Sequence, residues 1–177
     1  GYDGGCTSKD KQTLEKDITL SVSLYLASYL RQSGYIVKLT RETDTALSKA
    51  KREDIYKRVK MINDSNASIY ISIHANAYPS AYAKGAQVFY QTGKEENKML
   101  AESIMKELKS FDPANKREAL TIKDKYLIDN VKVPGCLVEI GFLSNQEELE
   151  NLVNPTYQAN LALTLYIGIQ EYLDYIK

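Results

Sequence analysis

The sequence predicts a single α/β domain, residues 1–177, with a mostly parallel twisted sheet flanked by helices on both faces. Two kinds of segment alternate along the chain. In one, apolar and polar residues alternate as in strands; in the other, apolar residues recur at helical spacing. A length of 177 residues is typical of one domain. The chain contains no internal repeat and no low-complexity linker that would divide it.

The first expected helix spans residues 15–32. Its apolar residues, among them Ile18, Val22 and Leu26, recur every three or four positions, and Gly34 supplies the stop. A short helix opens on Ser144 or Asn145 as its cap. The other segments with helical spacing are 49–66, 94–111, 145–152 and 156–176.

The strand at 69–74 has the clearest period of two. Its isoleucines lie on one side, while Tyr70, Ser72 and His74 lie on the other, so His74 ends the strand. Ligands of such sheets bind at the carboxyl ends of strands, which makes that position notable. The other strand candidates are 35–40, 85–91, 125–130 and 136–142.

Composition narrows the function classes. Lys+Arg and Asp+Glu number 23 each, and no basic patch or motif indicates nucleic-acid binding. The sequence contains no run of about 18 apolar residues, so it predicts no transmembrane helix.

The chain begins at GYDGGC rather than Met, so we expect upstream sequence that carries any export signal. Cys6 and Cys136 form no CxxC motif and leave the redox compartment open; Cys136 is expected to be a small buried residue.

Three polar residues stand out as site candidates. His74, the only histidine, is either a satisfied core residue or a site residue at the mouth of the sheet. Glu139 is a carboxylate in the apolar run CLVEIGF, which is unfavourable unless it is paired, protonated or bound to a cation. Glu15 lies in a first helical turn, where an acid also suits the helix dipole alone. A histidine and a glutamate on one zinc, with a further glutamate acting on water, is the arrangement of a metallohydrolase.

Several motifs occur in order: GYDGGC, LEKD, LTRETD, SIYISIHANA, KGAQVFY and PGCLVEIGFLSN. Together they resemble the zinc-dependent N-acetylmuramoyl-L-alanine amidases, the amidase type 3 family, over nearly the whole chain. GAQVFY and YLIDNVKVPGCLVEIGFLSN are most similar to the spore-cortex, germination-related amidases of endospore-forming bacteria. The resemblance implies that Glu15 and His74 are zinc ligands and that Glu139 is the catalytic carboxylate. The family's third ligand is a histidine in a GHGG motif that ends a first, buried strand. Aligned on that pattern, Gly1 is the last of these glycines, so we expect this strand and histidine upstream of residue 1.

The resemblance also implies the reaction and its setting. The expected reaction is hydrolysis of the amide between the lactyl group of N-acetylmuramic acid and L-alanine of the peptidoglycan stem peptide, in spore-cortex maturation with muramic lactam formation. Zn2+, peptidoglycan and an activator or scaffold protein are the expected cofactor and partners, and the site of action is outside the cytoplasmic membrane, in the spore cortex or intermembrane compartment. Asn76 either binds substrate or caps the turn. Arg41 either reaches a stem-peptide carboxylate or makes a structural ion pair.

Two alternatives remain at this point. A silent peptidoglycan-binding module, or an amidase that needs a partner for activity, would keep the same fold. A cysteine hydrolase would pair Cys136 or Cys6 with His74. Cys136 has the opposite strand parity to Glu139, so the two side chains are expected on opposite faces.

Overall fold

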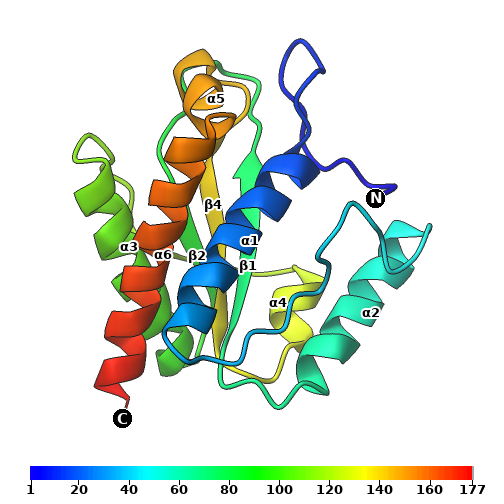
Figure 1. The fold of residues 1–177 in the computed structure, drawn as a ribbon, viewed down its shortest axis with the longest axis vertical. Helices are drawn as coiled ribbons and strands as arrows, with labels where there is room; N and C mark the ends of the chain where they lie inside the picture. Colours follow the sequence, from blue (N-terminus) through cyan, green and yellow to red (C-terminus); the bar gives the residue numbers. More distant parts are fainter. Residues whose placement is uncertain (177) are drawn as a thin grey trace.

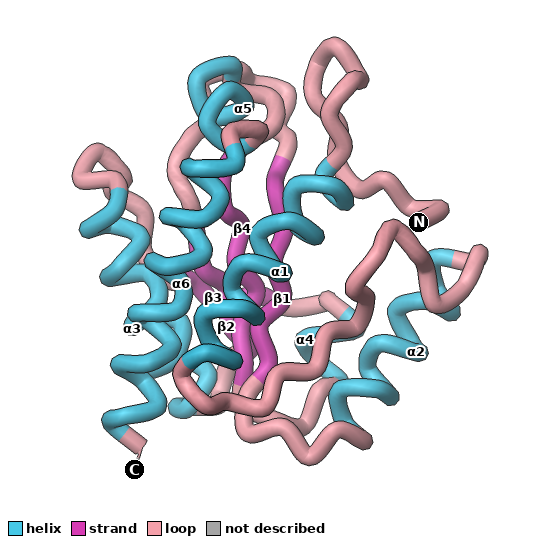
Figure 2. The backbone as a smooth tube through the Cα atoms, in the orientation of Figure 1, coloured by secondary structure: helices cyan, strands magenta, loops and turns pink. Residues whose placement is uncertain are grey.

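A four-stranded mixed sheet forms the centre of the molecule in the computed structural model, which describes residues 1–176. The strands are β1 (Tyr70–Asn76), β2 (Gln87–Gln91), β3 (Leu120–Ile122) and β4 (Gly135–Phe142), in the order β1-β4-β2-β3. The four strands lie together at the centre, with the helices around them (Figure 2). β1 and β4 pair in parallel, as do β2 and β3, whereas β2 and β4 are antiparallel. The sheet is therefore parallel at two of its three pairings, in agreement with the predicted class.

Helices cover both faces of this sheet (Figure 1). The helices on the face with the larger core are α1 (Glu15–Gln32), α3 (Glu95–Phe111) and α6 (Pro155–Tyr175). The helices on the other face are α2 (Lys51–Asn63) and α4 (Tyr126–Asn130). α5 (Gln146–Leu152) follows β4, and the Asn145 side chain caps it by accepting a hydrogen bond from Glu148 N–H at 3.2 Å. Both the predicted single domain and the predicted helix layers are confirmed.

Alternation along β4 divides its side chains between the two faces. Cys136, Val138 and Ile140 lie in the larger core, against α1, α3 and α6. On the opposite face, the ring of Tyr70 in β1 covers Gly135: a Cβ there would lie 2.1 Å from Tyr70 Cδ1. Only glycine fits beneath the ring, so Gly135 lets β1 and β4 pair from their first residues onward.

The predicted strand at 35–40 is wrong. The segment has no strand pairing within the described chain, and Ile36 is 93% exposed. It is held by side-chain bonds instead: Arg31 donates to the Val37 carbonyl at 3.1 Å, and Lys38 donates to the Ser65 carbonyl at 2.9 Å. Alternation and β-branched residues favour an extended backbone, but a strand also needs a partner for its main-chain groups.

The predicted strand at 125–130 is also wrong, because this segment forms α4. Ile128 is buried, and Leu127 and Val131, four residues apart, pack against the smaller core. In so short an apolar run, one helical turn and a strand give the same pattern. β3 was not predicted, since its three residues form an edge strand in which Leu120 is 48% exposed.

α3 and α6 approach each other closely at Gly168. A Cβ at this position would lie 2.7 Å from Ile104 Cα and 3.1 Å from the Ser103 carbonyl oxygen. The Ser103 hydroxyl donates to the Gly168 carbonyl at 2.8 Å across the same contact. Because the obstructing atoms are backbone, a larger residue can be admitted only by separating the helices.

We therefore expect Gly168→Ala to destabilise the fold by about 1–3 kcal/mol, as overpacking does elsewhere. Urea unfolding followed by circular dichroism measures this. Asn160→Ala, at an exposed position of α6, is the matched control and should change little. Equal unfolding midpoints for Gly168→Ala and the unsubstituted protein would contradict the packing argument.

Candidate metal and catalytic site

Glu15 is the first residue of α1, and a preceding loop holds its side chain. The Cys6 N–H donates to Glu15 Oε2 at 2.7 Å, and the Glu15 N–H donates to the Cys6 carbonyl at 2.9 Å. Gly5 has a positive φ of 70°, and a Cβ there would lie 2.3 Å from Glu15 Oε2. The loop can therefore wrap this closely around the carboxylate only with glycine at position 5.

His74 lies near the carboxyl end of β1, with its imidazole 41% exposed. Nδ1 is 2.8 Å from Glu15 Oε1, and Nε2 is 3.0 Å from Ser72 Oγ. The Ala75 N–H also donates to Glu15 Oε1 at 3.3 Å. A helix start and a strand end, distant in sequence, are thus joined by one carboxylate–imidazole contact.

The charges of this pair favour its ionised form. Burial raises the pKa of Glu15, but hydrogen bonds from His74 and the Cys6 N–H, with the imidazolium charge, outweigh it and hold the pKa below its usual value. Burial alone lowers the pKa of His74, yet the hydrogen bond and charge of Glu15 raise it overall. The contact is therefore one in which a positive charge, here a proton, is held between an oxygen and a nitrogen.

Glu139 lies directly opposite His74 in the parallel β1–β4 register. Its Oε2 is buried and has no hydrogen-bond partner in the described structure. The pKa of Glu139 is raised to about 7, chiefly by burial; the charge of His74 lowers it, the charge of Glu15 raises it and that of Lys125 lowers it. This oxygen lies beside two potential metal ligands and needs a bonding partner, which a water, a substrate or a cation would supply.

The donor types at this site fit zinc, which binds imidazole nitrogen and carboxylate oxygen. Glu15 Oε1 and His74 Nδ1 face each other, and the orphaned Oε2 of Glu139 lies at the neighbouring strand position. Residues 1–176 contain no group of three or more His, Cys, Asp or Glu side chains arranged to hold a metal ion. Glu15 and His74 would therefore need further donors to complete a zinc site.

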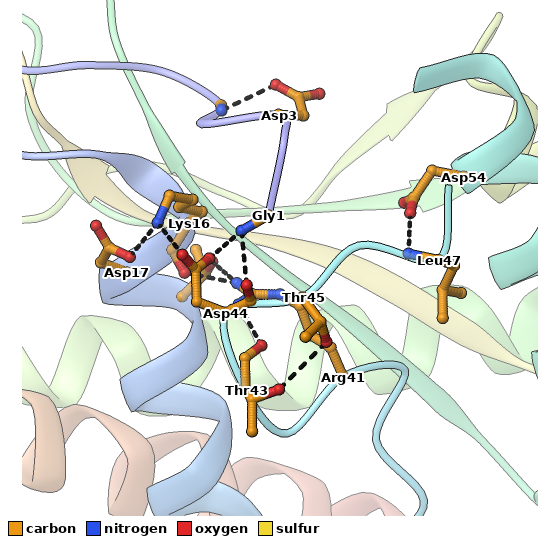
Figure 3. Close-up of polar contacts among 12 residues, drawn as sticks. Gly1, Asp3, Lys16, Asp17, Arg41, Thr43, Asp44, Thr45, Leu47 and Asp54 are labelled. Atoms are coloured by element: carbon orange, nitrogen blue, oxygen red, sulfur yellow. Dashed lines mark hydrogen bonds and ion pairs between the residues drawn. The ribbon is translucent and has the colours of Figure 1, made fainter. Parts of the chain in front are cut away.

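Arg41 and Asn76, the two expected substrate-binding residues, make contacts that hold the local structure. The Arg41 guanidinium donates to the Lys16 carbonyl at 2.5 Å and to Thr19 Oγ1 at 3.4 Å, which ties its loop to α1. Figure 3 shows this loop, in which Asp44 also accepts a hydrogen bond from the Lys16 ammonium at 2.9 Å. Asn76 is half-buried, and its carbonyl accepts the Leu143 N–H at 2.7 Å. Substrate binding by Arg41 or Asn76 stays a prediction.

Neither cysteine is placed as a nucleophile beside His74. Cys136 is fully buried in the larger core, opposite Ile71 in β1, and burial raises the pKa of its thiol. Cys6 is half-buried; burial and then the charge of Glu15 raise its pKa. A raised pKa reduces the thiolate that nucleophilic attack requires, so the geometry disfavours the cysteine hydrolase.

Comparison with known proteins decides the family. A model of the N-acetylmuramoyl-L-alanine amidases (Amidase_3) matches residues 1–171. The chain belongs to this family. It is 43% identical over 180 residues to the germination-specific N-acetylmuramoyl-L-alanine amidase of Bacillus subtilis, covering 97% of this chain and 75% of that protein. It is 29% identical to the amidase LytC of the same species, covering 90% of this chain and 31% of LytC.

Solved structures agree with this assignment to the amidase family. The CwlD amidase from Clostridioides difficile, in complex with the GerS lipoprotein, matches with a TM-score of 0.96 and 40% identity over 99% of this chain and 94% of that chain. The catalytic domain of the amidase CwlV from Bacillus (Paenibacillus) polymyxa matches with a TM-score of 0.84 and 30% identity, over 98% and 93% of the two chains. The predicted family and enzyme class, an N-acetylmuramoyl-L-alanine amidase related to germination amidases, are confirmed. Among residues 1–176, no helix has the length and apolar character needed to span a membrane.

The raised pKa of Glu139 predicts a pH-dependent stability for the metal-free amidase. A carboxyl with pKa about 7 in the folded state and about 4.3 unfolded favours folding while protonated. Stability should fall as pH rises between these values, and the full penalty, up to about 4 kcal/mol, should be present above pH 7. Glu139→Gln should remove that penalty.

Urea unfolding in the presence of a chelator, at several pH values from about 4 to 8, measures this. Glu139→Gln should be more stable than the unsubstituted protein at pH 8, and the difference should shrink toward pH 4. Glu95→Gln, at an exposed position of α3, is the control for the removal of a charge. A difference that stays constant over the whole range would show that Glu139 does not titrate as the geometry implies.

Proposed function

We propose that this amidase is zinc-dependent and cleaves the amide between the lactyl group of N-acetylmuramic acid and L-alanine of the stem peptide, with Glu15 and His74 as zinc ligands and Glu139 as the general base. One observation carries the proposal: Glu139, with an unpartnered buried oxygen, lies opposite His74, which in turn contacts Glu15. Zinc would supply Lewis acidity toward water and toward the amide carbonyl.

The residues of the chain account for the proton transfers. Glu139 takes a proton from the attacking water as the water oxygen bonds to the lactyl carbonyl carbon. It then delivers that proton to the alanine nitrogen as the C–N bond breaks, which releases the stem peptide with a free amine. A pKa of about 7 for Glu139 suits both steps, because the group can accept and return a proton near neutral pH.

A third protein ligand completes the proposed site, and the family resemblance suggests that it is a histidine on a strand outside the 177 residues. β1 pairs with β4 on one side and with no other described strand, so one edge of it is open near His74. The extended segment 35–40 also has no strand partner within residues 1–176. Both features are compatible with a further strand in this region. Arg41 and Asn76 remain predicted substrate contacts.

The biological setting is proposed from the relatives. The B. subtilis relative is named a germination-specific amidase, and the C. difficile relative is solved in complex with a lipoprotein. We therefore infer that this chain acts on peptidoglycan outside the cytoplasmic membrane, in spore-cortex maturation that leads to muramic lactam, with a protein partner as activator or scaffold. The silent-module alternative does not explain why a buried, unpaired carboxylate is retained beside His74.

The decisive experiment compares Glu139→Gln with His74→Ala in the full-length protein. Glu139→Gln should keep its zinc but lose about 10²–10⁴-fold in turnover, because only the proton transfers are removed. His74→Ala should lose zinc and turnover together, because it deletes a ligand. Zinc content by elemental analysis, and stem peptides released from purified peptidoglycan by mass spectrometry, are the two measurements.

Glu95→Gln, on an exposed part of α3, serves as the control and should match the unsubstituted enzyme in both measurements. Normal turnover by Glu139→Gln would show that another group is the base. Glycan left fully substituted by the unsubstituted, zinc-loaded protein would favour the silent binding module.

A further inference from the structure

Ser72 contacts the ring nitrogen of His74 that faces away from Glu15. Ser72 Oγ lies 3.0 Å from His74 Nε2, while Nδ1 of the same ring is 2.8 Å from Glu15 Oε1. The two residues are two positions apart in β1, so the pleat puts both side chains on one face of the sheet. The imidazole is thus held between a hydroxyl at one nitrogen and a carboxylate at the other.

Ser72 has two buried hydrophobic neighbours on its face of the sheet. Its partner across the sheet is Leu137, 9% exposed, and the preceding residue on its face is Tyr70, 8% exposed. A half-buried hydroxyl in such a place is unfavourable without a hydrogen bond. His74 Nε2 is the side-chain partner that the structure gives it.

We propose that Ser72 is a positioning residue for the metal, fixing which nitrogen of His74 is free to bind it. This inference rests on the proposed function, because the cation concerned is the zinc proposed there. A neutral imidazole carries one hydrogen, and Ser72 Oγ can accept it from Nε2. Nδ1 then presents its lone pair next to Glu15 Oε1.

The hydrogen bond also fixes the orientation of the ring. With 41% of the side chain exposed, packing covers only part of the imidazole, and χ2 of histidine has a broad energy well. A turn of the ring would carry Nδ1 away from Glu15. Hydrogen bonds to the second nitrogen of metal-binding histidines typically change metal affinity by 10–100-fold, and we expect the loss of Ser72 Oγ to fall in this range.

The test compares zinc affinity in Ser72→Ala and Ser72→Thr, using full-length protein and competition against a chromophoric chelator. Ser72→Ala should weaken zinc binding by about 10–100-fold. Ser72→Thr keeps the hydroxyl and suits a strand, so it should restore most of the affinity. Ser110→Ala, which also removes a hydroxyl bonded within its own element, is the matched control and should bind zinc normally. Unfolding midpoints of the metal-free proteins establish that each variant is folded.

A second readout follows the tautomer of the ring directly. His74 is the only histidine of these 177 residues, and the spectrum of His74→Ala identifies its signals in nitrogen-15 NMR of histidine-labelled protein. In the zinc-loaded protein, Nε2 should carry the hydrogen, and this signal should be broadened by exchange in Ser72→Ala but not in Ser72→Thr.

A zinc affinity of Ser72→Ala within about twofold of the unsubstituted protein, or a hydrogen found on Nδ1 in the zinc-loaded protein, would overturn the inference about Ser72. Unchanged zinc affinity in His74→Ala would instead overturn the proposed metal site itself. The two failures are therefore distinguishable.

Discussion

The parallel pairing of β1 with β4 is the constraint on which the site depends. It brings His74 opposite Glu139, and the register runs without interruption from Tyr70–Gly135 to that pair. Gly135 lies beneath the Tyr70 ring, and because it has no side chain the two strands can pair from this first position. A slip of one residue would turn Glu139 into the larger core and bring Cys136 or Val138 to the site face, so the whole arrangement depends on this one register.

The second constraint is the loop that precedes α1. Glu15 reaches His74 because α1 packs against β1 and because the loop at Gly5 and Cys6 wraps its carboxylate with a main-chain N–H. The start of a helix also favours a negative charge through its free N–H groups and dipole. The Cys6 N–H thereby holds Oε2 of the carboxylate, while Oε1 faces the imidazole. A side chain fixed in this way loses little further conformational entropy when it binds a cation.

Much of this fold could be predicted from the sequence, and what was missed has a common cause. The strand ending in His74 and the apolar run around Glu139 have patterns that follow directly from burial on a sheet. The predicted strands at 35–40 and 125–130 were wrong. The first has no pairing partner within the described residues, and the second forms helix α4, whose packing face a short apolar run does not reveal. Glu15 was indistinguishable from an ordinary acid at a helix start, and the family resemblance, not its spacing, singled it out. Its contact with His74 depends on tertiary packing, about which local pattern says nothing.

Glu15 and Glu139 have opposite electrostatic settings within one site. Hydrogen bonds and the imidazolium keep the pKa of Glu15 low, whereas burial without a partner raises the pKa of Glu139 to about 7. Near neutral pH the first is a permanent anion suited to hold a cation, and the second can exchange a proton. Hydrogen bonds, burial and the imidazolium charge thus give two identical side chains different proton affinities. Sites commonly distinguish a charge-stabilising carboxylate from an acid–base one in this way. Glu139 Oε2 receives no hydrogen bond of the kind that stabilises Glu15. This unpaired oxygen weakens the fold, and it is also the atom available for chemistry.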